Sequence, residues 1–86
     1  MKIEIVTKNG IEEVKEYSKI VFESVDGDIE ILEGHAPMLA FLMEGELKFY
    51  DEEREDIYQA GEGILEVQNN KVRILVDYLK GKVGDK

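Results

Sequence analysis

His35 is the residue of this chain best suited to chemistry, because an imidazole can act as a base, an acid or a metal ligand near neutral pH. It is the only histidine among 86 residues, and it lies in "EGHAP", Glu33–Pro37, together with the only proline. A lone histidine cannot build the usual multi-histidine metal site, and no zinc or calcium spacing surrounds it. Catalysis would need a hydroxyl from Ser18 or Ser24 and an orienting acid such as Asp28, a combination that most sequences offer by chance. We therefore expect no catalytic residue and no metal.

Two other segments contain residue types that can bind ions or cofactors. The acidic cluster "DEERED", Asp51–Asp56, could be drawn as a cation site, but consecutive acids in a hairpin turn are usually a solvated, charged tip. The glycine-rich segment "AGEGIL", Ala60–Leu65, lacks the lysine and the glycine spacing of a phosphate-binding loop. The sequence thus predicts no bound cofactor.

The composition excludes several classes of function. The formal net charge is −9, with 20 acidic and 11 basic side chains, so nucleic acid is repelled at long range. The longest stretch without a charge, Gly34–Met43, is much shorter than the roughly 20 apolar residues of a membrane-spanning helix. The N-terminus alternates charged and apolar residues, unlike a signal peptide. We expect an intracellular protein with no nucleic-acid partner and no direct membrane insertion.

Period-two alternation indicates short β-strands along most of the chain. In Lys2–Thr7, for example, Ile3 and Ile5 share one face of a strand. Turn signals separate the strands, including "KNG", "DGD", "DEERE" and "NNK". We count eight to ten strands and no helix, a pattern typical of an all-β sandwich or barrel. One domain is predicted over residues 1–79, followed by a polar, solvated tail over residues 80–86.

The segment around His35 supports two interpretations. In the structural one, Gly34 permits an unusual backbone angle, Pro37 fixes an extended entry to the next strand, and His35 bonds a loop carbonyl. In the functional one, His35, Met38 and Leu39 form an amphipathic edge offered to a protein partner, because exposed apolar groups beside polar ones are typical of interfaces.

Two stretches together carry a family resemblance. "DGDIEILEGHAPMLAFLMEGELKF", Asp26–Phe49, followed by "AGEGILEVQNNKVRILVDY", Ala60–Tyr78, resembles the N-terminal β-sandwich of the epsilon subunit of the bacterial rotary ATP synthase. The similarity runs from Met1 to about Tyr78, and Gly-His-Ala-Pro-Met-Leu followed by Gly-Ile-Leu-Glu-Val is a specific pair. The resemblance implies a flattened sandwich of two antiparallel sheets, without a helical hairpin and without active-site residues.

The resemblance also implies a role and its contact residues. The chain would be a rotor subunit of the central stalk, linking gamma to the membrane rotor ring of c subunits and coupling proton flow to ATP synthesis. It would lie peripherally at the cytoplasmic face of the bacterial inner membrane, and the isolated chain would be a monomer. The coupling ion stays open between proton and sodium. By position, the gamma interface would comprise His35, Met38, Leu39 and Ala40, and the rotor-ring contact Asp26, Gly27 and Asp28.

The chain departs from the family pattern at three points. Glu33 replaces the usual proline before Gly-His-Ala-Pro, so the loop is expected to be less rigid, and Gly61-Glu62-Gly63 replaces Ser-Gly-Gly. Nothing after Tyr78 resembles the two C-terminal helices that inhibit hydrolysis and, in some members, bind ATP. We therefore expect neither property here, whether the chain is naturally short or a piece of a longer one.

Two alternatives belong to other functional classes. The chain could be a free-standing β-sandwich module that binds a ligand or a partner, with a pocket lined by Tyr17, Tyr50 or Tyr58. It could also be an enzyme that uses His35, the weakest of the three hypotheses.

Overall fold

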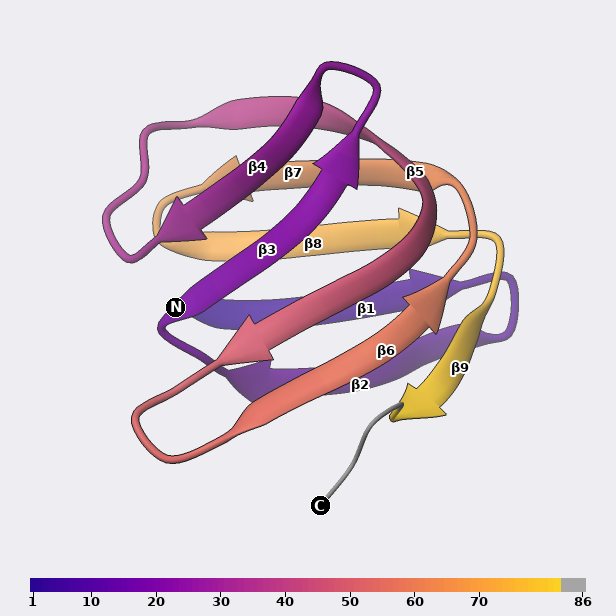
Figure 1. The fold of residues 1–86 in the computed structure, drawn as a ribbon, viewed down its shortest axis with the longest axis horizontal. Coiled ribbons are helices and arrows are strands. Elements are labelled where there is room, and N and C mark those ends of the chain that lie inside the picture. Colours follow the sequence, from indigo (N-terminus) through magenta and orange to yellow (C-terminus); the bar gives the residue numbers. More distant parts are fainter. Residues whose placement is uncertain (83–86) are drawn as a thin grey trace.

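The computed structural model describes residues 1–82, in which the chain forms nine strands and no helix (Figure 1). The all-β prediction is confirmed, and the strand count falls within the predicted range. No helical segment within these residues is therefore long and apolar enough to cross a membrane. The strands are β1 (Lys2–Thr7), β2 (Gly10–Glu16), β3 (Lys19–Ser24), β4 (Gly27–Leu32), β5 (Met38–Tyr50), β6 (Glu55–Ala60), β7 (Gly63–Gln68), β8 (Lys71–Val76) and β9 (Leu79–Lys82).

A single hydrogen-bonded sheet folds over along β5 to make two layers. The first half of β5, residues 38–42, pairs with β7, whereas residues 45–50 pair with β6. Residues 47–50 also pair with β3, which meets β5 again at Leu42. The first layer thus comprises β2, β1, β8, β7 and the first half of β5. The second layer comprises β4, β3, the second half of β5, β6 and β9. Two separate sheets were predicted, but the 13 residues of β5 are long enough to serve both layers.

One strand pair departs from the predicted antiparallel arrangement. β1 and β8 run parallel in the middle of the first layer, with Ile3 opposite Val72 and Ile5 opposite Ile74. These strands are distant in the sequence, so no tight hairpin has to join them and the pairing direction is unconstrained by a turn.

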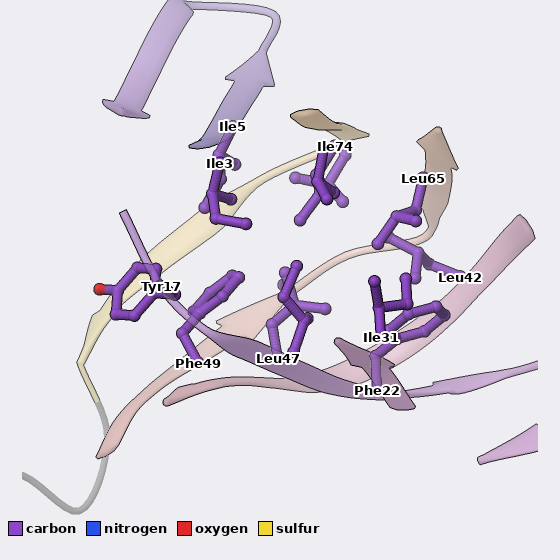
Figure 2. Packing of buried hydrophobic residues seen from close by; sticks show 14 of the residues in the cluster. Ile3, Ile5, Tyr17, Phe22, Ile31, Leu42, Leu47, Phe49, Leu65 and Ile74 are labelled. Carbon is purple, nitrogen blue, oxygen red and sulfur yellow. The ribbon is translucent and has the colours of Figure 1, made fainter. Parts of the chain in front are cut away.

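The core lies between the layers, because alternate side chains of each strand point inward. Figure 2 shows Ile3, Ile74 and Leu65 of the first layer facing Leu47 and Phe49 of the second. All five side chains are almost completely buried. No disulfide is available in this cysteine-free chain, so hydrophobic packing is the main stabilising term.

The predicted tail overlaps the last strand. Lys80 pairs with Gln59 of β6, and Lys82 pairs with Tyr58, so the polar segment after Tyr78 extends the second layer by one short strand. The remainder of the predicted tail, residues 83–86, lies outside the described residues.

Candidate functional site

The predicted gamma segment begins at the loop before β5 and continues into that strand. Strand alternation turns Leu39 outward, with 61% of its surface exposed, and turns Ala40 into the core at 6%. Met38 packs against the core from its edge. The side chain of Ala40 lies inside the sandwich, so a partner could reach this position only through its backbone, and its assignment to the gamma interface stays a prediction. Leu39 is the member of this set best placed for contact.

His35 supports its own loop. Its Nδ1 lies 2.7 Å from the carbonyl oxygen of Ala36, so an Nδ1–H donates there, and its backbone N–H donates to the carbonyl of Leu32. The Gly34 N–H donates to Oδ1 of Asn70 in the β7–β8 turn at 3.0 Å, and Gly34 adopts a φ of 79° that favours glycine. Two parts of the structural interpretation are confirmed, the backbone angle of Gly34 and the bond of His35 to a loop carbonyl. A contribution of His35 to partner binding stays a prediction.

The predicted rotor-ring turn lies at the other end of β4 from His35. Ser24 is buried, its hydroxyl donates to the carbonyl of Gly27 at 2.9 Å, and it accepts the N–H of Asp26 at 3.0 Å. Gly27 has a φ of 110°, which explains the glycine in "DGD". The side chains of Asp26 and Asp28 are exposed on this fixed turn. Since six residues of strand span roughly 20 Å, the two predicted contacts are well separated.

The residues proposed for an enzyme are engaged elsewhere. The Ser18 hydroxyl donates to the carbonyl of Tyr50, and that of Ser24 holds the turn just described. Asp28 lies at the opposite end of β4 from His35, so the four residues do not assemble into a nucleophile and base. Among residues 1–82 no group of three or more acidic or histidine side chains could hold a metal ion.

The acidic cluster of the β5–β6 hairpin divides into two parts. Glu52 and Glu53 are exposed, as expected of a solvated tip. Asp56 is only 2% exposed; it accepts a hydrogen bond of 2.6 Å from the Tyr17 hydroxyl and lies 3.5 Å from Nε of Arg54. The interpretation of the whole cluster as a wet tip was wrong for Asp56, because Tyr17 is distant in the sequence and no local pattern predicts the pair.

The contact with Asp56 changes the acidity of Tyr17. Burial of the ring and the hydrogen bond to this carboxylate raise the pKa of Tyr17 far above its ordinary value, because both disfavour the phenolate. The pair ties the β2–β3 link to β6 inside the sandwich, and its role is structural.

The tyrosines do not line a shared pocket. Tyr17 and Tyr58 are buried, and each packs against Phe49, with ring centroids at 5.0 and 5.8 Å. The Tyr50 hydroxyl donates to Glu55, and Nζ of Lys19 lies 4.6 Å from its ring centroid. The positions therefore give no support to the alternative of a tyrosine-lined ligand site.

An exposed line of apolar side chains crosses the outer face of the first layer. The strand register places Phe41 of β5 opposite Ile64, Ile64 opposite Leu75, Leu75 opposite Val6, and Val6 opposite Ile11. Opposite residues point to the same side of a sheet, so these five form one continuous row across five strands, here called the apolar row. Phe41, Ile11 and Leu75 expose 56%, 62% and 44% of their surfaces, which is unusual for large apolar residues of one face.

Charged side chains border the apolar row on both sides. One neighbouring row holds Glu62 and Asp77, whose backbones are hydrogen-bonded to each other. The other contains Glu66, Arg73 and Glu4, in which Nε of Arg73 lies 3.3 Å from Oε1 of Glu4. On β7, β8 and β1 the apolar surface is therefore one residue wide along the strands, whereas on β5 the exposed side chains of Leu39, Phe41 and Met43 widen it.

The sequence contained a signal for this row that was missed. Phe41, Ile64 and Leu75 fall at outward positions of their strands, within the uninterrupted apolar runs "LAFLM", "IL" and "ILV". A strand with one face in water should alternate with polar residues there. Two adjacent apolar residues mark strands that are covered on both faces, which is what a docking surface requires.

Comparisons with known proteins agree on one family. The family model of the ATP synthase Delta/Epsilon chain, beta-sandwich domain, matches residues 1–80. The ATP synthase epsilon chain of Chlorobium limicola is 32% identical over 77 residues, with 88% of each chain covered. The sodium ion specific ATP synthase epsilon chain of Propionigenium modestum is 30% identical over 76 residues, which cover 88% of this chain and 56% of that one. The chain thus spans most of one of these relatives and about half of the other.

Solved structures share the fold. A chain of the central stalk/c-ring structure of the Tetrahymena thermophila mitochondrial ATP synthase superposes with a TM-score of 0.81 at 18% identity, covering 94% of this chain and 66% of that one. A chain of the Euglena gracilis mitochondrial ATP synthase gives a TM-score of 0.84 at 18% identity, covering 92% and 51%. At this level of identity the likeness concerns the β-sandwich itself.

Proposed function

The chain belongs to the family of ATP synthase delta/epsilon chains through their β-sandwich domain, and on that premise we propose that it is a non-catalytic subunit of the central stalk. In this role it links the gamma subunit to the membrane rotor ring, so that proton flow through the ring is coupled to ATP synthesis. It sits peripherally at the cytoplasmic face of the bacterial inner membrane. The isolated chain is a monomer.

The apolar row is the observation that carries this proposal. In a chain with a net charge of −9 and 36% charged residues, a sheet face in water is expected to carry polar side chains. Five aligned apolar side chains on such a face are therefore not explained by folding alone. Such a band, bordered by charges, has the anatomy of a protein interface, with an apolar centre and a polar rim. We assign the gamma contact to this row. Leu39, the outward member of the predicted set, extends it by one position along β5.

The Asp26–Asp28 turn supplies the second contact. Its two carboxylates stand on a turn that Ser24 and Gly27 hold in one conformation, so they can face basic side chains of the polar rotor-ring loops without an ordering cost. Val25, next to Asp26 in the same turn, donates its backbone N–H to the carbonyl of Phe41. The ring contact and the end of the apolar row are therefore neighbours, an arrangement suited to a subunit that joins two partners.

Binding of a purified cognate gamma subunit, measured by titration calorimetry, tests the proposal. Phe41→Glu and Leu75→Glu each place a charge in the apolar row, and we expect each to weaken binding by about tenfold or more, the size of an interface hot spot. Leu32→Glu is the matched control, because Leu32 is 52% exposed on the second layer. The affinity of the Leu32→Glu variant for gamma should stay close to that of the unaltered chain. Absence of gamma binding, or an equal loss in the control, would contradict the assignment.

A further inference from the structure

Ile64 forms a ridge between two open grooves on the first layer. The groove on the β5 side has a volume of about 560 Å³, and the groove on the β1 side about 330 Å³. Glu62, Gly63, Ile64 and Asp77 border both. Ile64 is thus a ridge within the apolar row, and the row passes through a hollow on each side of it. Val25, Phe41 and Met43 line the first groove, and Val6 and Leu75 line the second.

We propose that the apolar row binds one amphipathic helix of its partner, lying across the strands, with a basic side chain of that helix over Glu62 and Asp77. The inference rests on the proposed function only in taking gamma as the protein that carries the helix. It adds the secondary structure, the direction and the charge of the segment that docks.

The spacing of the row favours a helix over a strand. Neighbouring strands lie about 4.8 Å apart, and successive turns of an α-helix rise about 5.4 Å, so an apolar residue on each turn meets one strand of the row. Same-face residues of an extended segment recur only every 6.6 Å or so, and they drift out of step within two strands. Four strand spacings amount to roughly 19 Å, which about 13 helical residues cover.

The width of the row on β7, β8 and β1 favours a helix that crosses the strands. On these three strands the next row holds Glu66, Arg73 and Glu4, so a helix parallel to them would lay its apolar stripe over charged groups and desolvate them. A helix parallel to β5 would meet Leu39, Phe41 and Met43 but would leave Ile64 and Leu75 uncovered. A helix across the strands keeps its stripe on apolar residues. Two of its apolar side chains then enter the grooves on either side of Ile64, the arrangement by which an amphipathic helix seats in a groove.

The acidic side chains beside the apolar row favour a basic residue on the docking helix. Glu62 and Asp77 are both exposed, and neither forms an ion pair with a side chain that the structure describes. On the opposite side, Glu4 is already neutralised by Arg73 and Lys71. Lys8 borders the groove on the β1 side, so the basic residue of the helix belongs over β7 and β8 and not over β1. The net charge of the chain favours a cationic segment at long range as well.

Two synthetic peptides of about 15 residues test the charge and the helix without gamma. Both carry one apolar stripe, and they differ only in a lysine or a glutamate at the position facing Glu62 and Asp77. Fluorescence anisotropy at low salt should give at least about tenfold tighter binding for the lysine peptide. Ile64→Glu, or Phe41→Glu should the first variant fold poorly, should remove binding of both peptides. The double variant Glu62→Lys with Asp77→Lys should reverse the preference, and Glu23→Lys on the second layer should leave it unchanged.

Cross-linking to gamma tests the helix in the partner itself. The chain has no cysteine, so Phe41→Cys, Ile64→Cys and Leu75→Cys each accept one thiol-directed photoreactive label. Mass spectrometry should place the three cross-links in one segment of gamma, stepped by three or four residues from strand to strand. Steps of two residues, or sites in unrelated segments, would overturn the proposal.

The two experiments separate this inference from the proposed function. If gamma does not bind and the lysine peptide binds with the predicted selectivity, the proposed function fails and the helix site stands. If gamma binds but both peptides bind equally or not at all, the helix site is wrong and the assignment of gamma is kept.

Discussion

The two layers of the sandwich share one core but have different outer faces. Among the side chains that the structure describes, eight large apolar ones are exposed, and of these only Leu32 lies on the outer face of the second layer. The others belong to the first layer, to β5 where it bends, or to the turn beside Phe41. On the second layer Val21 and Ile57 are half-buried among charged neighbours such as Lys48, which faces both across the strands. Folding requires apolar residues only on the inner faces, so the excess on one outer face points to a second role for the first layer.

The largest effect on stability is expected from an alanine substitution at a glycine of the first layer, compared with the same substitution in the second layer. A Cβ placed on Gly63 of β7 would lie 1.8 Å from the carbonyl oxygen of Leu75, so Gly63→Ala must displace the backbone that carries the apolar row. We expect a loss of about 3 kcal/mol in the free energy of unfolding, the upper part of the range for overpacked sites. Gly81→Ala in β9 is the control, since its Cβ would meet nothing within 4 Å. Urea denaturation of both variants measures the difference, and equal stabilities would show that the first layer adapts freely.

Tyr17→Phe tests whether the core contact behind the second layer is structural. Removing the hydroxyl deprives buried Asp56 of its 2.6 Å hydrogen bond, and we expect a loss of about 1–2 kcal/mol near neutral pH. Because the pKa of Tyr17 is raised in the folded state, its contribution is full below the ordinary tyrosine pKa of about 10 and declines as pH rises above it. The difference between the variant and the unaltered chain should therefore shrink above pH 10. Thermal unfolding as a function of pH measures this difference. Half-buried Tyr50→Phe serves for comparison, because its hydroxyl bonds exposed Glu55 and its loss should cost less at neutral pH. A difference that grows at alkaline pH would contradict the assignment.

His35→Ala asks whether the loop that joins the layers belongs to the gamma interface. His35 lies at the end of β4 away from the Val25 turn, so we expect a smaller loss of gamma affinity than for Phe41→Glu, about two- to threefold. Stability should change by about 0.5 kcal/mol or less, because the ring bonds only its own loop. Calorimetry measures the affinity of the His35→Ala variant for gamma, and its melting temperature measures the stability. A loss as large as that of Phe41→Glu would extend the interface to this loop, and a collapse of stability with affinity kept would leave His35 a purely internal support.

Asp28→Lys is expected to have the smallest effect. The exposed carboxylate contributes about 0.2–1 kcal/mol through an ion pair, and such rim charges mainly change association rate and salt sensitivity. The isolated chain should stay folded and bind gamma, while attachment to the rotor ring weakens at low salt and recovers at high salt. Glu52→Lys at the β5–β6 tip makes the same charge change as a control. If proton pumping by the reassembled complex at low salt is unaffected by Asp28→Lys, the ring assignment of this turn is wrong.

Local patterns predicted the strands and turns because each depends on neighbouring residues. Alternation at Ile3 and Ile5, the Asn69–Asn70 turn with both φ values near 60°, and the glycine of "DGD" follow from backbone geometry alone. The single folded sheet could not be predicted from these local patterns. The bend at which β5 passes from one layer to the other depends on which strands pair with each half of β5. Those pairings are long-range and leave no local signature.

The contact residues were harder to predict because they depend on cross-strand register. The gamma segment was assigned from the motif, which does not say which of its side chains point outward; strand alternation places Leu39 on the outer face and Ala40 in the core. The apolar row required knowing that Phe41, Ile64 and Leu75 come to lie side by side on three strands. The burial of Asp56 required its pairing with Tyr17, 39 positions away in the chain.

Methyl NMR of the isoleucine- and leucine-labelled chain, recorded with and without purified gamma, tests the docking of gamma on the first layer most directly. Ile64 and Leu75 report on the apolar row, and Ile57 and Leu32 report on the outer face of the second layer. We predict that gamma shifts or broadens the methyl signals of Ile64 and Leu75 and leaves those of Ile57 and Leu32 in place. Perturbation confined to Ile57 and Leu32 would contradict the assignment of the first layer as the docking surface.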